Sequence, residues 1–237
     1  MDELTELTRY LNWLLREKIF WIFIAFHAIF SGAVSYALHG KSAVLLSLGD
    51  YLYVVEIITI ALDFIIMALV TNKVREYLGF GKLAAPTAVV VYLKAFVKVS
   101  LPTLPIIAIV GLLFLFKTNS QYGFKLPIYF SAPLTAALTC WARLGESLAF
   151  ARGNTDHLIG RTYRLMKMHF KHFLPAFLLV ISTGLLPVLF WLAFGRPGDP
   201  DTQGYSMPLS FFLTLVVAVI VPYLLMKKIK EFASVSL

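Results

Sequence analysis

The chain is poor in cysteine and in charge. It holds one cysteine among 237 residues, and charged residues make up only 14% of them. Cys140 has no second thiol to pair with, which excludes an internal disulfide and favours a small packing residue within an apolar run. There is no nucleophile elbow, P-loop, HExxH or CxxC motif, and the glycine-rich Gly79-Phe80-Gly81 follows no predicted strand. We therefore expect no enzyme activity and no bound cofactor or metal.

Apolar sequence takes the place of charge. Hydrophobic residues make up 59% of the chain, and several apolar runs reach the roughly 20 residues that a helix needs to cross a bilayer. The runs predict six spans, at about 19–38, 51–70, 99–116, 127–149, 173–194 and 208–226. The predicted fold is an all-α, polytopic membrane bundle of six transmembrane helices, with both chain ends on the same side.

The distribution of basic residues predicts which side that is. All but four of the 21 Lys and Arg residues lie on the side of the chain ends, the exceptions being Lys41, Lys117, Lys125 and Arg196. Basic residues strongly favour cytoplasmic loops during insertion, so we expect both termini in the cytoplasm and the protein in the cell (inner) membrane. The first residues, MDELTEL, are acidic where a secretory signal is basic, so no cleaved leader is expected.

The net charge of +8 raises the question of an acidic partner. No DNA- or RNA-binding motif accompanies it, and the cations flank apolar spans. Attraction to anionic lipid headgroups, worth about 1 kcal/mol per juxtamembrane Lys or Arg, accounts for this placement. Membrane lipids are therefore the expected partner, with other membrane-protein subunits as further candidates, whereas nucleic acid is not expected.

The organisation repeats three times, in units of about 1–82, 83–152 and 153–237 that form a single transmembrane domain. Each unit has a basic amphipathic segment followed by a helical hairpin of two spans. A shift of 70 positions aligns the ends of the second and fourth spans, pairing Lys73/Arg143, Glu76/Glu146, Leu78/Leu148, Phe80/Phe150 and Lys82/Arg152. Since each unit has two crossings, the repeats run parallel and permit a pseudo-threefold arrangement about the membrane normal.

Each even-numbered span ends in a base, an apolar residue, any residue and a glutamate, as in Lys228-Ile229-Lys230-Glu231. A cation in the last turn complements the helix dipole, and a glutamate three residues on shares its helix face. These residues are either stop-transfer anchors or a shared cytoplasmic rim that binds headgroups or partners. The candidate rim consists of Lys73, Arg75, Glu76, Lys82, Arg143, Glu146, Arg152, Arg161, Arg164, Lys167, Lys171, Lys228, Lys230 and Glu231.

An amphipathic stretch precedes each odd-numbered span, at Leu11–Lys18, Ala88–Lys98 and Leu158–Lys171. Such stretches usually lie in the headgroup layer with the apolar side down, the alternative here being straight extensions of the spans. We expect interfacial or steeply bent helices, because prolines remove a backbone donor where the later segments meet their spans. These prolines occur in Leu-Pro pairs at 101–102, 104–105 and 174–175.

Two segments carry a resemblance to a known family. Asn72–Phe116 combines a small-residue turn, an amphipathic helix and Leu-Pro, and Gly160–Phe190 contains the basic run Arg161-Thr162-Tyr163-Arg164-Leu165. Over nearly its whole length the chain resembles the six-helix membrane domain joined to some glycerophosphodiester phosphodiesterases, and the stand-alone relatives of that domain. The resemblance implies a six-helix membrane fold. This sequence contains no soluble phosphodiesterase domain, so the enzymatic activity is not implied.

Ionisable residues inside the predicted spans are candidates for function, because a charge in hydrocarbon costs at least a few kcal/mol. Glu56, Thr59 and Asp63 share one face of the second span. Counted from the cytoplasmic end, Asp63 lies about 10 Å deep and His27 of the first span about 12 Å. The two could meet across the first hairpin, either as a proton-relaying pair or as a static contact worth about 0.6 kcal/mol.

His169 and His172 have a spacing that can present two metal ligands from one helix. No carboxylate or cysteine lies near them in sequence to complete a site. Contact with headgroups is the ordinary alternative, and no metal is expected.

Two functions fit these observations. The primary hypothesis is a non-enzymatic scaffold, accessory or assembly subunit, whose basic helices engage anionic lipid and whose bundle organises other membrane components. The alternative is a small transporter or lipid-handling permease, with His27, Glu56 and Asp63 lining a path and the repeats as moving parts.

Overall fold

The computed structural model describes residues 3–39, 49–100, 103, 125–194 and 215–236. Within these ranges all regular structure is helical and no strand occurs, which confirms the all-α prediction. The helices are α1 (Glu3–Leu14), α2 (Lys18–His39), α4 (Gly49–Tyr77), α5 (Ala85–Ser100), α7 (Lys125–Arg152), α8 (Leu158–Phe194), the π-helical segment η2 (Val216–Ile220) and α10 (Val221–Ser236).

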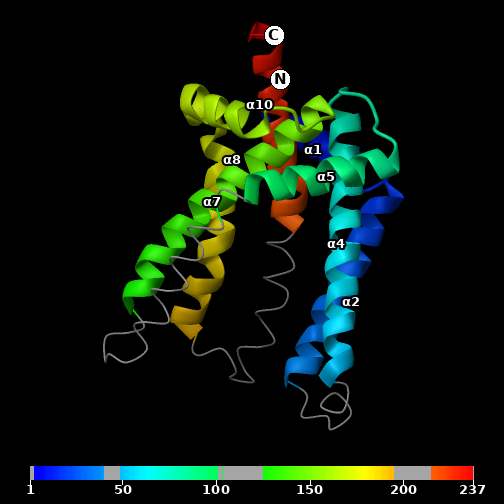
Figure 1. Cartoon of the computed structure of the whole chain (residues 1–237), viewed down its shortest axis with the longest axis vertical. Helices are drawn as coiled ribbons and strands as arrows, with labels where there is room; N and C mark the ends of the chain where they lie inside the picture. The colour runs from blue at the N-terminus through cyan, green and yellow to red at the C-terminus, as the bar shows by residue number, and fades with distance from the viewer. Residues whose placement is uncertain (1–2, 40–48, 101–102, 104–124, 195–214, 237) are drawn as a thin grey trace.

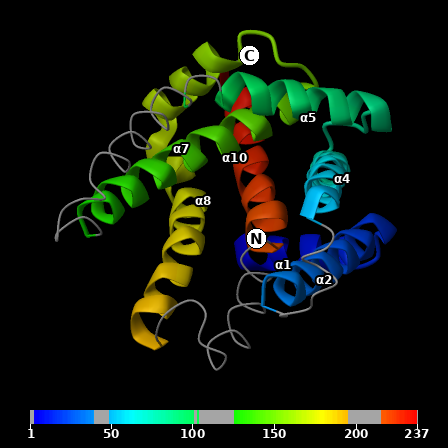
Figure 2. The same cartoon turned by 60° about the horizontal axis from the view of Figure 1, so that its bottom comes forward.

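The helices divide into long legs and a layer that crosses them at one end. α2 packs beside α4, and α7 beside α8, and in Figure 1 these pairs extend downward from the layer. α5 and the first part of α8 lie across the top, together with α1 (Figure 1). The first and last described helices, α1 and α10, both lie at this end, and Figure 2 shows the same layer from below.

Four described helices cover sequence ranges that were predicted as spans. α2, α4 and α7 contain the spans predicted at 19–38, 51–70 and 127–149, and α8 contains that at 173–194. The span at 99–116 lies mostly outside the described residues, as does the first part of 208–226. In the described ranges one helix, Ile57–Tyr77, is long and apolar enough to cross a membrane, and the apolar helix Lys18–Ile29 is shorter.

The structure differs from the prediction in the limits of the first amphipathic segment and in the position of the bend after the third. The first was predicted at Leu11–Lys18, but α1 spans Glu3–Leu14 and α2 begins at Lys18. The third bends at His169, whose φ of −127° and ψ of 19° are not helical, whereas the bend was predicted at Leu174-Pro175. Because His169 precedes Pro175 by more than one turn, the missing amide of that proline does not itself form the break.

The ends of the helices that hold the even-numbered predicted spans form a ring. α4, α7 and α10 contact one another pairwise, α5 contacts both α4 and α7, and α8 contacts both α7 and α10. α1 completes the pattern, because Tyr10 stacks on Tyr223 of α10 at 4.3 Å between ring centroids and lies 5.1 Å from Tyr77 of α4. Each amphipathic helix thus lies at the junction between the helices of two even-numbered spans.

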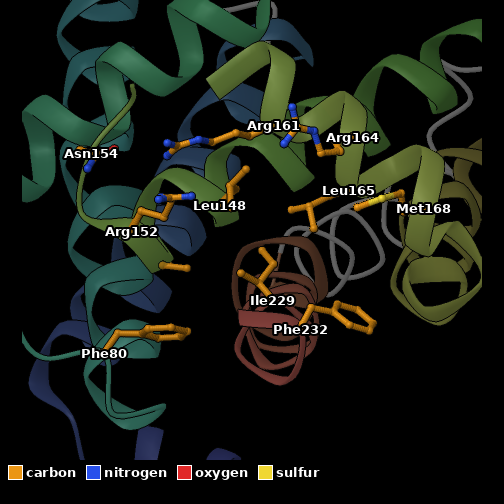
Figure 3. A pocket seen from close by; sticks show the side chains of 11 residues that line it. Phe80, Leu148, Arg152, Asn154, Arg161, Arg164, Leu165, Met168, Ile229 and Phe232 are labelled. Atoms are coloured by element: carbon orange, nitrogen blue, oxygen red, sulfur yellow. The ribbon is translucent and has the colours of Figure 1, made fainter. Parts of the chain in front are cut away.

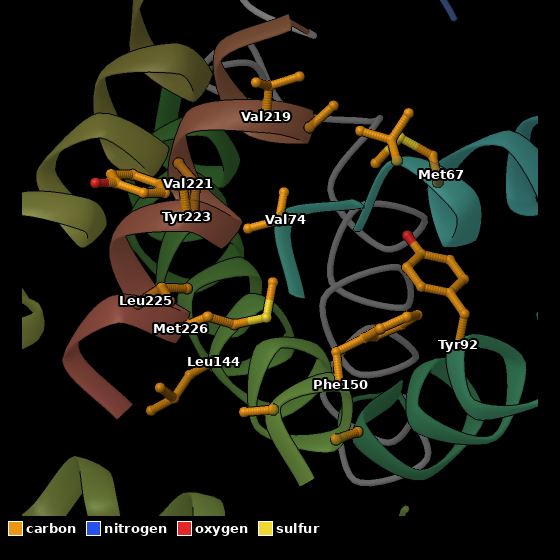
Figure 4. Close-up of a cluster of buried hydrophobic side chains, with 14 of the residues drawn as sticks. Met67, Val74, Tyr92, Leu144, Phe150, Val219, Val221, Tyr223, Leu225 and Met226 are labelled. Carbon is orange, nitrogen blue, oxygen red and sulfur yellow. The ribbon is translucent and has the colours of Figure 1, made fainter. Parts of the chain in front are cut away.

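The apolar core lies inside this ring (Figure 4). Val74 and Leu144 are fully buried and Ile229 is 5% exposed, and these three occupy the same position of the base-x-x-Glu motif in α4, α7 and α10. Phe150 of α7 packs against Tyr92 of α5 at 6.0 Å between ring centroids. The motif therefore places one buried apolar side chain from each unit in the same core cluster.

The π-helical turn before α10 has a local cause. The amide of Val221 bonds to the carbonyl of Val216, and the next residue is Pro222, which has no amide to donate. A wider turn ahead of a proline relieves the clash of its ring with the preceding carbonyls. The hydroxyl of Tyr10 donates to the carbonyl of Val219 in this turn at 3.3 Å, so α1 is anchored at the irregular segment.

The junction between α5 and α7 requires a glycine. A Cβ atom at Gly145 would lie 2.3 Å from Cγ1 of Val99, a distance that real side chains do not tolerate. The two helices therefore approach closely because α7 has no side chain at this point.

Gly145→Ala is expected to lower the free energy of unfolding by about 1–3 kcal/mol, because α5 must move away from α7 to admit the new methyl group. Gly160→Ala is the matched control, since nothing lies within 4 Å of its Cβ position and alanine favours a helix. Unfolding of the purified protein in mild detergent measures both effects. Equal stability of the two variants would disprove the need for close approach.

Candidate functional site

The base-x-x-Glu motif forms the same ion pair in all three units. Nitrogen and carboxylate oxygen lie 3.1 Å apart in Lys73–Glu76, 2.9 Å apart in Arg143–Glu146 and 3.0 Å apart in Lys228–Glu231. The Arg143–Glu146 pair is the most enclosed, with Glu146 only 6% exposed. The repeat is therefore one of side-chain contacts as well as of sequence.

In two of the three units, the third residue of the motif caps a neighbouring helix. Arg75 is buried, and its Nη1 donates to the carbonyls of Phe150 and Ala151 at the end of α7, the latter at 2.9 Å. Its Nη2 donates to the carbonyl of Phe80 at 2.7 Å. Lys230, the same motif position in α10, donates to the carbonyl of Leu78 just beyond α4 at 2.5 Å. α10 thus caps α4, and α4 caps α7, with cations at the negative ends of the helix dipoles.

Further ion pairs attach α1 and its turn to the ring. Lys73 contacts Glu17 at 2.8 Å, Lys228 contacts Glu3 at 3.3 Å, and Lys227 pairs with Glu6. The hydrogen bond from Lys227 holds the pKa of Glu6 below its ordinary value. These pairs are partly exposed, so each contributes little on its own.

The predicted rim therefore separates into groups with different surroundings. Eight members are engaged within the chain, and they are Lys73, Arg75, Glu76, Arg143, Glu146, Lys228, Lys230 and Glu231. Arg75 and Glu146 are buried, so neither faces outward as the rim prediction requires. Lys82, Lys167 and Lys171 are exposed. The remaining three, Arg152, Arg161 and Arg164, lie together.

These three arginines line a groove of about 650 Å³ between the ends of α7, α8 and α10. Figure 3 shows Arg161 and Arg164 along α8, Arg152 on α7, and Ile229 and Phe232 on α10 facing the opening. The remaining lining residues are mostly apolar: Phe80, Leu148, Ala151, Asn154, Leu165 and Met168. The groove combines positive charge with an apolar wall.

The three arginines of the groove lack a salt bridge within the described part of the chain. None of the described residues forms a salt bridge with Arg152, Arg161 or Arg164, and no acidic residue lines the groove. Burial and the neighbouring Arg161 cation lower the pKa of Arg152, which Asp156 only partly opposes. A guanidinium stays charged in proteins, so an anion in the groove would relieve this repulsion.

The His27–Asp63 contact predicted across the first hairpin is present. Nε2 of His27 lies 3.1 Å from Oδ1 of Asp63, joining α2 to α4. The side chain of His27 is 14% exposed and that of Asp63 is 42% exposed. The rings of Phe23 and Phe26 flank the imidazole, with centroids 4.4 and 5.4 Å away. The contacting atoms are covered and their angles do not fit a hydrogen bond to any described residue.

The other candidates from the sequence lie elsewhere. Thr59 is buried on α4, one turn before Asp63, and the side chain of Glu56 lies outside the described residues. His169 and His172 both pack on Phe232, at 4.0 and 5.2 Å between ring centroids. No group of three or more metal-ligating side chains occurs in the described part of the chain.

Sequence reasoning missed the groove and the capping contacts. The alignment of the three motifs already places Arg75, Gly145 and Lys230 at one position, which signals that the position has different tasks in the three units. Nothing in the sequence pattern predicted the apolar wall that α10 contributes, because Ile229 and Phe232 line the groove with the arginines only through tertiary packing.

Comparison of the chain with known protein families, curated proteins and solved structures finds no match. The resemblance to the six-helix membrane domain therefore stays a prediction that rests on its own residues.

Arg75→Leu is expected to lower the free energy of unfolding by about 2–3 kcal/mol, because it leaves buried carbonyls at the end of α7 without a donor. Lys230→Leu removes the corresponding but exposed contact and is expected to cost about 1 kcal/mol or less. Chemical unfolding in detergent, followed by tryptophan fluorescence, measures both. If the two variants lose the same stability, Arg75 is not the buried cap described here.

Proposed function

We propose that the protein is a non-enzymatic, multi-pass membrane protein that crosses the bilayer six times and serves as a scaffold, accessory or assembly subunit engaging anionic lipid. Its observed support is the single layer in which the amphipathic helices and the basic helix ends gather. A cationic layer at one end of apolar legs fits the inner leaflet, where anionic headgroups attract Lys and Arg.

Exposed apolar side chains on the legs support the membrane setting. Ile29 of α2 is 71% exposed, Ile57 of α4 is 66% exposed and Leu178 of α8 is 53% exposed. In water such residues on several neighbouring helices would form an unusually large apolar surface. In a bilayer they face hydrocarbon, which also fits the length and hydropathy of Ile57–Tyr77.

The orientation follows from the same layer. The first and last described helices lie on the basic side, so both termini would be cytoplasmic. The cations that the fold does not engage, above all Lys82, Lys167 and Lys171, would contact headgroups directly.

A variant carrying Lys82→Gln, Lys167→Gln and Lys171→Gln is expected to lose most of its anionic-lipid enrichment. Each juxtamembrane cation contributes about 1 kcal/mol, so the ratio of phosphatidylglycerol to phosphatidylcholine in co-purified lipid should fall at least about fivefold. Lipid mass spectrometry of protein isolated from mixed-lipid nanodiscs measures the ratio.

The matched control for that variant is Lys41→Gln with Lys117→Gln and Lys125→Gln, which removes the same charge from the predicted outer side. It should leave the enrichment unchanged, and an equal loss in both triple variants would contradict the orientation. Protein mass spectrometry on material isolated in mild detergent identifies subunits that co-purify, which the scaffold role requires.

A transporter or lipid-handling permease is the second candidate, and the His27–Asp63 contact favours it. The contact places an imidazole beside a carboxylate between two predicted spans, and ionisable pairs within spans often lie on transport paths.

His27→Ala combined with Asp63→Asn should abolish a proton-linked flux if the transporter proposal is right, because both proton-binding groups are gone. A pH-sensitive dye inside proteoliposomes measures that flux. His172→Ala, which removes an imidazole far from the pair in sequence, is the control. Wild-type protein with no proton flux under any gradient would eliminate this candidate, and a double variant that loses only stability would make the pair structural.

A further inference from the structure

Two junctions of the ring are equivalent in sequence but differ in structure. The shift of 70 positions pairs Val91 with Arg161 and Ala95 with Leu165. On α5, Val91 is 6% exposed and Ala95 is fully buried, so the junction between α4 and α7 is filled. On α8 the corresponding residues line the groove between α7 and α10. The third unit therefore carries an open site where the second unit is closed.

The two junctions are packed by different side chains. Gly145 lets Val99 of α5 approach α7, and the corresponding position of α10 carries Lys230. The partner of Val99 in the third unit is His169, where α8 bends. In the third unit Phe232 of α10 stacks on His169 at 4.0 Å between ring centroids, and the groove lies beside this contact, lined by Phe232 and by residues of α7.

The residues placed around that space select for an anion. Arg161 replaces a core valine, Arg152 and Arg164 stand beside it, and no described residue forms a salt bridge with them. Arg152 and Arg161 repel each other, and an anion bound between them would offset that repulsion. Their planar, forked donors match the oxygens of phosphate better than a single point charge does.

The opposite wall selects for a ligand with an apolar part. Ile229 and Phe232 face the opening from α10, and Phe80 closes one side. The volume of about 650 Å³ lies within the range of sites for small ligands, about 300–1,000 Å³. A bare inorganic ion would leave most of this space unused.

We propose that this groove is a stoichiometric binding site for a phosphate monoester that carries an apolar group. Arg161, Arg152 and Arg164 bind the phosphate, and Ile229 and Phe232 contact the apolar part. The ligand is either the headgroup end of a phosphomonoester lipid or a cytosolic phosphate ester. The proposal goes beyond general attraction of the rim to anionic lipid, because it requires one saturable site.

Binding to the full chain in phosphatidylcholine nanodiscs tests the proposal. Two soluble probes, dihexanoyl phosphatidate and adenosine monophosphate, represent the lipid and the cytosolic source, and dihexanoyl phosphatidylcholine is the probe without net charge. Equilibrium dialysis measures stoichiometry, and thermal unfolding reports the stabilisation by the bound probe. Saturable binding of one molecule of either monoester, and none of the zwitterion, is expected.

Two variants of the groove should weaken that binding at least about tenfold, since each removes a charge-assisted contact. Arg161→Val introduces the residue of the filled junction. Arg164→Gln changes an exposed side chain, so we expect the variant to fold. Lys94→Gln, the position of α5 that corresponds to Arg164, removes the same charge outside the groove and should not change the affinity.

The outcomes separate the possibilities. Binding of phosphatidate alone assigns the lipid source, and binding of adenosine monophosphate alone assigns the cytosolic source. Failure of both monoesters to saturate a single site overturns the proposal, as does an equal loss of affinity in Lys94→Gln. If Arg161→Val does not fold, Arg164→Gln decides. The two proposals can fail separately. If the triple lysine variant keeps its lipid enrichment but the groove still binds one monoester saturably, the proposed headgroup contact of the rim is wrong and the groove proposal stands.

Discussion

The structure depends on bringing the ends of three parallel units into one layer. α4 and α7 end there and α10 passes through, so the negative ends of helix dipoles and unpaired carbonyls come together around an apolar centre. Cations from neighbouring units satisfy these carbonyls. Arg75 donates to the end of α7, and Lys230 donates to the carbonyl of Leu78 beyond α4. Positive charge in this layer is therefore first a requirement of the fold.

This requirement changes how the basic residues are interpreted. A cation that caps a helix or pairs with a glutamate on its own helix is already satisfied, and its presence says little about partners. The proposals above rest instead on cations that no described residue engages. They lie on the exposed faces of the amphipathic helices and, in greater concentration, in the groove between α8 and α10. The repeat makes the distinction visible, because the same position is core in one unit and charged in another.

The His27–Asp63 contact belongs to a different part of the molecule. It joins the first hairpin away from the basic layer, between aromatic rings on one side and a partly exposed carboxylate on the other. Among the described residues, none of the ion pairs at the helix ends includes His27 or Asp63, so variants of the pair leave those ion pairs in place. The layer and the pair therefore support different proposals, and neither proposal needs the other.

Local chemistry determined what the sequence alone could predict. Apolar runs gave the helices, helical spacing gave the base–glutamate pairs, and comparable depth in two adjacent runs brought His27 to Asp63, because these depend on spacing along one or two helices. The tertiary structure alone decided that α8 bends at His169 rather than at Leu174-Pro175, that Arg75 is buried, and that Arg161 opens a groove where Val91 fills one. These outcomes depend on contacts between helices far apart in the chain, such as the close approach of α5 to α7 that the missing side chain of Gly145 permits, and spacing along one helix does not specify such contacts.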